Sequence, residues 1–446
     1  MIVSPAWSGK KFAVLGLARS GKATVEALLA GGAEVWAWDT SVEKREDLAD
    51  NIIDVSAEHN FDFALHFADP TELDLTGCAA VVVSPGVPLN THPIAGHAAK
   101  FGVPVIGDIE LFAEARAHLP PHKVVGITGT NGKSTTTALV HHILKTAGVP
   151  TSMGGNIGLP ILEQDPLAPN DNGVGVYVLE LSSYQIDLTF SLDCNVAVLL
   201  NVTPDHLDRY DSFEAYAASK ARLFAMQGDE RVAIVDYRSE ADEDVLLNAP
   251  ENTFIQFIDD VNVLDRQADW PSLQGPHNLA NAKAAVAVCR ALELADPANA
   301  EGLRTFRGLP HRMERVEEIS GVAYVNDSKG TNTAATAPAL AAFGNIHWIV
   351  GGLAKEPGLG ECEAQLSHVK AAYTIGSAGP EFAALLESHV PVTRSETLDR
   401  AVRDADAAAE PGDTVLLSPA CASFDQFADF EARGEAFRAA VKELAA

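Results

Sequence analysis

The chain has 446 residues, 47% apolar and 21% charged, which is enough for several globular domains with cores of their own. Its 61 acidic residues outnumber its 32 basic ones, for a formal net charge of −29. A surface of this charge repels nucleic acid and anionic membranes, so we expect neither as a partner.

The cysteines and the apolar runs indicate the compartment. The five cysteines are scattered and form no Cys-x-x-Cys pair, which argues against a disulfide framework and a structural zinc site. Met1–Lys11 contains no apolar leader segment, and no apolar run is long enough to span a bilayer. We therefore expect a soluble, cytoplasmic protein that does not insert into membranes.

Short apolar runs alternate with helical patterns along the whole chain, which is typical of α/β units around parallel sheets. The first set predicts a helix over Ser20–Ala30 and strands at Phe12–Leu17, Glu34–Trp38 and Ala79–Val83. After Pro120-Pro121, strands are predicted at Val124–Ile127, Val176–Leu179, Val196–Leu200 and Val232–Val235, followed by a helix from His277 towards Leu294. After Gly308-Leu309-Pro310, strands are predicted at Val322–Val325, Ile346–Val350, Tyr373–Ile375 and Val415–Leu417.

This pattern predicts an α/β protein of three domains. We place a Rossmann-like N-terminal domain at residues 1–112, a central P-loop-type ATPase domain at 113–308 and a Rossmann-like C-terminal domain at 309–446.

A glycine-rich segment between a predicted strand and a predicted helix indicates a phosphate-binding loop, with the residues Gly129, Thr130, Asn131, Gly132, Lys133, Ser134 and Thr135. Glycines let backbone N–H groups turn towards phosphate oxygens at a helix N-terminus. Lys133 would reach the β- and γ-phosphates of ATP and the Ser134 hydroxyl would bind Mg²⁺. Ile127 stands where the strict motif has its first glycine, and a plain helix N-terminus with incidental glycines is the alternative.

This form of the loop, with Thr-Asn before Gly-Lys-Ser-Thr, resembles that of the Mur ligases and the folylpolyglutamate synthetases. Both families join a carboxylate to an amino acid through an acyl phosphate formed from ATP. The resemblance implies ATP as a substrate and Mg²⁺, two ions, as the metal.

Two acidic strand ends could hold that metal. Glu180 ends an apolar run, where a carboxylate points into the crevice at the edge of a parallel sheet, although alone it is more often a solvated strand end. The segment around His206 follows another buried strand and resembles the Asp-His-x-Asp motif of Mur ligases, which implies that His206 helps bind the second Mg²⁺.

Three further residues of the central region gain a role only from the resemblance. Lys220 reads as an ordinary helix-surface lysine, yet the matching lysine of the family is carbamylated and supports the metal site. Asn278 and Asn281 match asparagines that contact the adenine side of ATP, with helix capping as the alternative for Asn278.

The first domain carries Gly16-Leu17-Ala18-Arg19-Ser20-Gly21, which is similar to a dinucleotide fingerprint except for Ala18. A dehydrogenase is therefore an alternative, which NAD(P)H binding would reveal. In the Mur ligases that add D-glutamate, this domain binds the UDP end of the substrate, and Ser84-Pro85-Gly86 matches their Ser-Pro-Gly loop. The resemblance implies substrate contacts at Leu17, Arg19, Ser20, Asp39, Thr40, Gly86 and, from the central domain, Asn156.

The third domain distinguishes branches of the family. Residues 417–427, Leu-Ser-Pro-Ala-Cys-Ala-Ser-Phe-Asp-Gln-Phe, resemble the D-glutamate-adding branch, and the Asp-Asn-Pro-Arg motif of the diaminopimelate- and lysine-adding branches is absent from the sequence. The resemblance implies that Thr331, Lys355, Ser423 and Phe430 surround D-glutamate. Ala354 departs from the pattern, because the family usually has a polar residue before this lysine.

Two more segments of this domain match family motifs. His311-Arg312-Met313-Glu314 resembles the Pro-His-Arg-x-Glu linker, and residues 326–332 combine Asp327, Lys329 and hydroxyl groups at one strand exit. The resemblance implies that Arg312 and Asp327 contact ATP and that Lys329 stabilises charge near the acyl phosphate. A simple turn would also use Asn, Asp, Ser and Gly here.

Taken whole, the resemblance implies a monomeric enzyme that joins D-glutamate to UDP-N-acetylmuramoyl-L-alanine with ATP, with Lys133, Lys220, His206 and Lys329 in catalysis. Another Mur ligase or a folylpolyglutamate-type enzyme is the nearest alternative. A nucleotide-binding switch without turnover is an alternative of another class.

Overall fold

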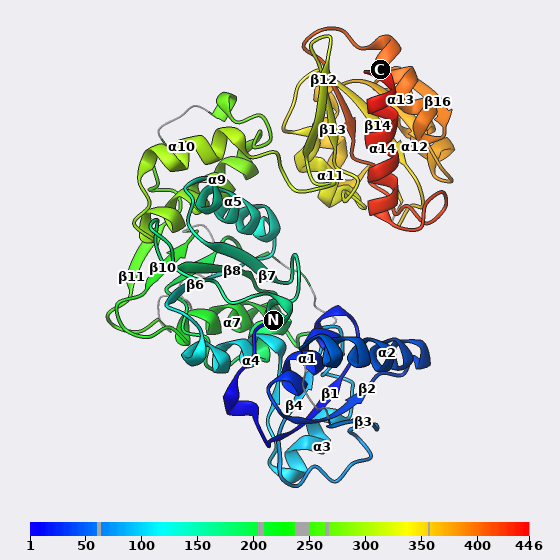
Figure 1. Ribbon diagram of the computed structural model, residues 1–446. Helices are drawn as coiled ribbons and strands as arrows, with labels where there is room; N and C mark the ends of the chain where they lie inside the picture. The colour runs from blue at the N-terminus through cyan, green and yellow to red at the C-terminus, as the bar shows by residue number, and fades with distance from the viewer. Residues whose placement is uncertain are drawn as a thin grey trace. The chain divides into compact units, whose positions relative to one another are not determined.

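The computed structural model describes residues 1–59, 64–203, 205, 209–236, 249–263, 267–355 and 357–445, with only the backbone of 53–59. The chain folds into two compact units, one made of residues 1–262 and 283–299 and the other of residues 263–282 and 300–446. In the described part, the strands form three sheets (Figure 1).

The first sheet has five parallel strands in the order β3-β2-β1-β4-β5, which matches the first five strands of the classic Rossmann order. Its strands are β1 (Lys11–Leu15), β2 (Glu34–Trp38), β3 (Ala64–Phe67), β4 (Cys78–Val83) and β5 (Val105–Ile106). The helices between them are α1 (Arg19–Ala30), α2 (Val42–His59) and α3 (Ile94–Phe101), and α4 (Asp108–Ala115) follows β5.

The second sheet has six parallel strands in the order β11-β10-β9-β6-β8-β7. Its strands are β6 (His122–Thr128), β7 (Thr151–Gly155), β8 (Gly175–Glu180), β9 (Val196–Leu199), β10 (Val232–Val235) and β11 (Phe254–Phe257). The helices of this region are α5 (Lys133–Thr146), α6 (Ser183–Asp187), α7 (Phe213–Ala225), α9 (Pro276–Ala291) and α10 (Asp296–Thr305).

A continuous apolar core joins the first two sheets within one unit. Phe112 on α4 packs edge-on against Tyr177 on β8, with ring centroids 5.1 Å apart. Backbone hydrogen bonds cross the same boundary, from Ile2 N–H to Leu162 O and from Gly107 N–H to Leu188 O, each 2.9 Å long. The loops of the first sheet are therefore held against those of the second.

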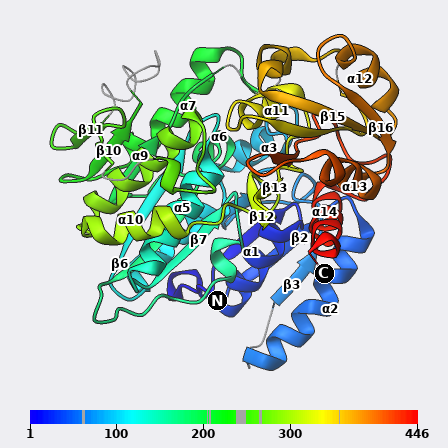
Figure 2. The ribbon, with the colours of Figure 1, turned by 90° about the horizontal axis from the view of Figure 1, so that it is seen from above.

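The third sheet has the order β12-β13-β17-β14-β15-β16, and only β12 runs antiparallel to its neighbour. Its strands are β12 (Glu314–Ile319), β13 (Val322–Asn326), β14 (Ile346–Gly351), β15 (Val369–Ile375), β16 (Val392–Glu396) and β17 (Thr414–Leu417). Apolar side chains of α11 (Thr333–Leu340) and α12 (Gly379–Leu386) pack on one face. Those of α13 (Leu398–Ala408) and α14 (Phe430–Leu444) pack on the other, where the two helices lie side by side (Figure 2).

The structure confirms the predicted α/β class and all of the predicted strands, with small differences in their bounds. The pattern missed the short or exposed edge strands β3, β5, β7, β11, β12 and β16. Edge strands such as β12, with the sequence Glu-Arg-Val-Glu-Glu-Ile, lack the continuous apolar run that burial on both faces produces. No helix among the described residues is long and apolar enough to cross a membrane.

Candidate active site

The predicted phosphate loop connects β6 to α5, as the sequence pattern requires. Gly129 (φ 148°) and Gly132 (φ 84°) take backbone conformations that favour glycine. A Cβ atom at Gly129 would lie 3.1 Å from Leu200 Cβ and 3.2 Å from Asn201 O, so the loop runs close against the end of β9. Ser134 is buried in the first turn of α5 and Thr135 is half-buried beside it. The backbone therefore has the form that cradles phosphate.

Two predicted catalytic lysines point into this loop. Lys133 Nζ donates to Gly129 O (2.9 Å) and Thr130 O (2.8 Å), and Lys220 Nζ, from α7, donates to Gly129 O at 3.0 Å. Lys220 is only 1% exposed. Burial, and next the charge of Lys133, lower the pKa of Lys220 to about 7. A substantial fraction of this amine is therefore neutral near pH 7.

Glu180, at the end of β8, supplies the carboxylate of the site. Its Oε1 accepts a 2.9 Å hydrogen bond from Asn156 Nδ2, so the structure brings these two predicted residues together. Its buried Oε2 has no hydrogen-bond partner among the described residues. A carboxylate oxygen buried without a hydrogen bond is a suitable ligand for a cation. The described residues contain no ready-made cluster of three His, Cys, Asp or Glu side chains, and His206 lies outside them.

Two residues that the sequence analysis did not single out hold the phosphate loop in place. The side-chain amide of Asn201 makes two hydrogen bonds with the backbone of Asn131. Asn201 Oδ1 accepts from Asn131 N–H (2.8 Å), and Asn201 Nδ2 donates to Asn131 O (3.0 Å). Tyr216 contacts Thr130 Oγ1 through its hydroxyl (3.2 Å), and its ring lies 4.5 Å from Lys220 Nζ. Tyr216 precedes Lys220 by four residues on α7, a helical spacing that could have indicated their contact.

The predicted UDP-binding residues gather at the carboxyl ends of β1, β2 and β4. Asp39 Oδ2 accepts from Leu17 N–H at 2.9 Å. Burial acts to raise the pKa of Asp39, but hydrogen bonds from the N–H groups of Leu17 and Ser41 and the nearby Lys44 outweigh it, so the net pKa is lowered. Thr40 and Gly86 are exposed at this edge, and Ser20 lies in the first turn of α1. The edge can therefore offer a permanent carboxylate to a ligand.

At this edge, arginines connect segments of the first-sheet region with segments of the second-sheet region. Arg19 Nη2 donates to Gly158 O at 3.3 Å, close in the chain to Asn156. Arg209 reaches Val87 O (3.3 Å) and Gly86 O (3.4 Å) in the opposite direction. The segments expected to contact the UDP substrate from the first and the central domain are thus connected directly.

In the second unit, Asp327 directly follows the end of β13, and its carboxyl group is buried. Ser418 Oγ donates to its Oδ2 (2.7 Å) and Met313 N–H to its Oδ1 (3.2 Å). Burial raises the pKa of Asp327 to about 7, against the effect of the Ser418 hydrogen bond and of Arg312. The predicted ATP contacts Arg312 and Asp327 therefore lie close enough to interact electrostatically.

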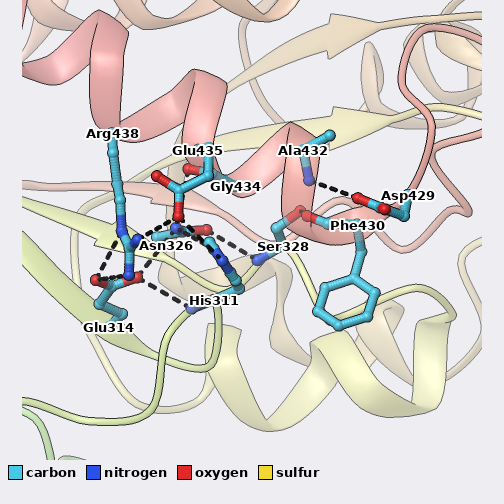
Figure 3. Close-up of polar contacts among 10 residues, drawn as sticks. All are labelled: His311, Glu314, Asn326, Ser328, Asp429, Phe430, Ala432, Gly434, Glu435 and Arg438. Carbon is cyan, nitrogen blue, oxygen red and sulfur yellow. Dashed lines mark hydrogen bonds and ion pairs between the residues drawn. The ribbon is translucent and has the colours of Figure 1, made fainter. Parts of the chain in front are cut away.

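Phe430 and Lys329 meet beside the first turn of α14, where Lys329 Nζ lies 4.9 Å from the centre of the Phe430 ring. Figure 3 shows a polar cluster of His311, Glu314, Asn326, Glu435 and Arg438, and the Phe430 ring lies edge-on to the His311 ring with ring centroids 6.2 Å apart. In that cluster Arg438 donates to Glu314, while Asn326 Nδ2 approaches His311 Nδ1 to 3.0 Å. Asp429 caps α14 by accepting from Ala432 N–H at 2.6 Å. These contacts hold the linker that precedes β12 against α14.

The residues expected around D-glutamate lie on loops at the carboxyl edge of the third sheet. Lys355 Nζ donates to Thr331 Oγ1 at 3.0 Å, and both follow strands of this sheet. Ser423 is buried in the loop after β17.

The two asparagines expected on the adenine side of ATP, Asn278 and Asn281, lie on α9, where Asn281 Nδ2 donates to Asn278 Oδ1 at 3.2 Å.

A buried arginine that the sequence analysis missed lies beneath these loops. Arg433 donates to Ser328 O (2.9 Å), Ser328 Oγ (3.0 Å) and Cys421 O (3.1 Å), so it ties the loops after β13 and β17 together. Burial lowers its pKa to about 10, and its Nη1 has no hydrogen-bond partner within the described residues. No local pattern marks it, since its partner Ser328 is 105 residues away.

Two family models match parts of this chain. Residues 127–260 match the family model described as the Mur ligase middle domain, and residues 311–421 match the Mur ligase glutamate ligase domain. The UDP-N-acetylmuramoylalanine–D-glutamate ligase of Novosphingobium aromaticivorans is 60% identical over all of this chain and 97% of its own length. The protein of the same name from Sphingopyxis alaskensis is 57% identical, with both chains fully covered.

A solved structure supports the fold independently. The UDP-N-acetylmuramate–alanine ligase of Thermotoga maritima superposes with a TM-score of 0.56 at 17% identity, covering 98% of this chain and 99% of its own. At that identity the likeness concerns the fold alone, and it confirms the predicted three-domain architecture. From the matched domains and the full-length relatives, the chain belongs to the Mur ligase family.

Proposed function

We infer that this chain is an ATP-dependent ligase that joins D-glutamate to UDP-N-acetylmuramoyl-L-alanine in the synthesis of peptidoglycan precursors. The observation that carries this conclusion is the 60% identity, over the full chain, to a relative that bears this activity in its name. The phosphate loop with two converging lysines supports the use of ATP.

The reaction proceeds in two steps through an acyl phosphate. An oxygen of the alanyl carboxylate attacks the γ-phosphorus of ATP, and the bond to the β-phosphate oxygen breaks to release ADP. The amine of D-glutamate then attacks the acyl carbon, and inorganic phosphate leaves as the amide forms and the amine loses a proton. Phosphoryl transfer depends mainly on positioning and on charge neutralisation, so the protein needs few covalent contributions.

Lys133 is the phosphate-binding cation in this proposal. Its ammonium is held by two carbonyls of its own loop, so its position is set before ATP arrives. Gly129–Thr135 surround the phosphates, and Asn278, Asn281, Arg312 and Asp327 bind the rest of the nucleotide. Lys329, with its ammonium beside the Phe430 ring, stabilises charge on the acyl phosphate.

We assign two Mg²⁺ ions to Ser134, Glu180, His206 and a carbamylated Lys220. Bound there, Mg²⁺ would supply positive charge to the phosphate oxygens. The orphaned Glu180 Oε2 supports this assignment, and the lowered pKa of Lys220 supports carbamylation because the neutral amine is the form that reacts with CO₂.

The UDP end of the acceptor is assigned to Leu17, Arg19, Ser20, Asp39, Thr40 and Gly86, with Asn156 near the muramoyl end. D-Glutamate is assigned to Thr331, Lys355, Ser423 and Phe430. Lys355 and two hydroxyl groups suit a side-chain carboxylate, because charge-assisted hydrogen bonds are the strong ones. We further propose that the enzyme acts as a cytoplasmic monomer and binds no nucleic acid, consistent with its net charge of −29.

Phosphate release tests the function directly. The protein is incubated with Mg²⁺, ATP and UDP-N-acetylmuramoyl-L-alanine against D-glutamate, L-glutamate, L-alanine, meso-diaminopimelate and L-lysine. We expect release only with D-glutamate, together with a product heavier by one glutamyl residue. Release with another amino acid would contradict the assignment of the third domain, and ATP binding without any release would indicate a nucleotide switch.

A further inference from the structure

The segment that leads into α9 is closed by side-chain amides. Gln267 Nε2 donates to Leu273 O (2.7 Å) and Gly275 O (2.5 Å). Gln274 Nε2 donates back to Gln267 O (2.8 Å) and Trp270 O (2.7 Å). The two glutamines therefore hold residues 267–275 in one compact turn around the fully buried Trp270.

Backbone geometry tightens the same turn. Gly275 has a φ of 84°, and a Cβ atom there would lie 3.2 Å from Ala342 Cα and 3.1 Å from the His277 ring. Leu279 N–H donates to Gly275 O at 3.1 Å, so the turn continues into the helix without a break. Any loosening at residues 267–275 is thus transmitted to the first turns of α9.

The main-chain carbonyl of Gln274 connects this turn to two side-chain amides of α9. Asn278 Nδ2 donates to Gln274 O (3.0 Å), and Asn281 Nδ2 donates to Asn278 Oδ1 (3.2 Å). Asn278 and Asn281 are both buried. We call Gln267, Gln274, Asn278 and Asn281 the amide relay.

The donor and acceptor roles of the contacted groups determine which end of each side-chain amide in the relay is the nitrogen and which is the oxygen. A backbone carbonyl only accepts, so the nitrogen ends of Gln267, Gln274 and Asn278 must face the carbonyls that they contact. The oxygen end of Asn278 then faces Asn281, which must present a nitrogen to it. The relay therefore fixes which end of the Asn281 amide is the donor and which is the acceptor.

That orientation has a consequence for nucleotide choice. An asparagine amide of fixed direction pairs with adenine, which offers the N6 amino donor beside the N7 acceptor. Guanine offers two acceptors, O6 and N7, at the same edge. We propose that Gln267 and Gln274 are positioning residues for nucleotide recognition: they hold the turn whose Gln274 carbonyl orients Asn278, and through Asn278 the Asn281 amide, and thereby favour adenine over guanine. This rests on the proposed function, in which Asn281 faces the adenine of ATP.

Gln274→Leu and Gln267→Leu test the proposal, since each removes one pair of side-chain hydrogen bonds. For each, the KM for ATP should rise and the preference of kcat/KM for ATP over GTP should fall by about tenfold, the effect of losing one or two hydrogen bonds. The KM values for D-glutamate and for the UDP substrate should stay unchanged. Two variants are used so that one remains informative if the other does not fold.

Gln227→Leu is the matched control. Gln227 Nε2 also donates to two carbonyls, Cys194 O (3.0 Å) and Val232 O (3.1 Å), but it lies at the opposite ends of the strands from the phosphate loop. This variant should lower the melting temperature while keeping the wild-type preference for ATP. A similar fall in preference in Gln227→Leu would mean that general loosening, not positioning, is responsible.

Asn281→Ala distinguishes the proposed adenine contact of Asn281 from the proposed positioning role of Gln267 and Gln274. In that background, Gln274→Leu should cause no further loss of ATP preference, because both act through the same amide. If Asn281→Ala lowers the preference and neither glutamine variant does, the positioning role is wrong. If Asn281→Ala leaves both the KM for ATP and the preference unchanged, the proposed adenine contact itself is wrong, and the positioning role falls with it.

Discussion

Lys133 and Lys220 direct their ammonium groups at the same oxygen, Gly129 O, from 2.9 and 3.0 Å. Two cations that share one buried acceptor repel each other, and this repulsion adds to burial in lowering the pKa of Lys220 to about 7. Conversion of Lys220 to a carbamate would replace this repulsion with attraction.

Replacing Lys220 with arginine introduces a permanent cation and prevents carbamylation. We expect Lys220→Arg to lose activity by roughly 10- to 100-fold or more, the scale for lost support of a metal site. In ¹³C NMR with labelled bicarbonate, the wild-type protein should show a carbamate signal that Lys220→Arg lacks. Full activity in the variant would exclude carbamylation as a requirement.

Glu180→Gln tests the metal assignment with little change of shape. The amide can still accept from Asn156 through its oxygen, but it places a donor where the orphaned Oε2 now lies. Activity should fall by about 100-fold or more, and half-maximal activity should require more Mg²⁺. Glu114→Gln, at a carboxylate that accepts from Trp7 Nε1, is the control and should keep its Mg²⁺ dependence. An unchanged Mg²⁺ requirement in Glu180→Gln would contradict the assignment.

Lys355→Met tests the D-glutamate site. Loss of a charged hydrogen-bond donor should raise the KM for D-glutamate by about 10- to 100-fold and leave the KM for ATP unchanged. Lys442→Met, an exposed lysine in the last turn of α14, removes the same charge elsewhere and should behave as wild type. Equal effects on both substrates would point to a role of Lys355 outside the D-glutamate site.

Asp108 predicts a pH dependence of stability. It is buried at the start of α4, its Oδ2 has no partner among the described residues, and burial raises its pKa to about 6 from an ordinary 3.8. Because the folded state binds this proton more tightly, the acid favours folding below about pH 4 and progressively disfavours it as pH rises through 6. By pH 7 the cost approaches about 3 kcal/mol.

Asp108→Asn removes that ionisation and retains an oxygen for the Ile109 N–H, which Oδ1 accepts at 3.1 Å. The variant should be no more stable than wild type at pH 4 and more stable at pH 7, as measured by the midpoints of urea unfolding. A difference between the two proteins that does not change with pH would show that Asp108 is not the titrating group.

Much of the fold could be predicted because buried parallel strands must be apolar on both faces. The runs at β2 and β10 were predicted with their observed bounds, and β14 and β17 to within one residue. Edge strands escaped prediction, since residues such as Phe254 on β11 face solvent, and strand pairing there depends on a neighbour distant in the chain.

The residues of the candidate site also divide into those that a local sequence pattern predicts and those that only the packed structure reveals. The phosphate loop, Glu180 and the residues of the D-glutamate branch are local patterns, because a phosphate needs a glycine turn and a strand exit needs a short polar segment. The sequence by itself therefore determined the family and the chemistry, and it predicted most of the candidate residues.

Only the tertiary structure decided which side chains hold those residues in position. Asn201, Tyr216 and Arg433 resemble ordinary polar or core residues in the sequence, and their partners are known only after strands and helices pack. The same is true of Gln267 and Gln274, whose donors find carbonyls only once the turn has closed. The physical reason is that a hydrogen bond between distant residues is set by packing and leaves no periodic signal along the chain.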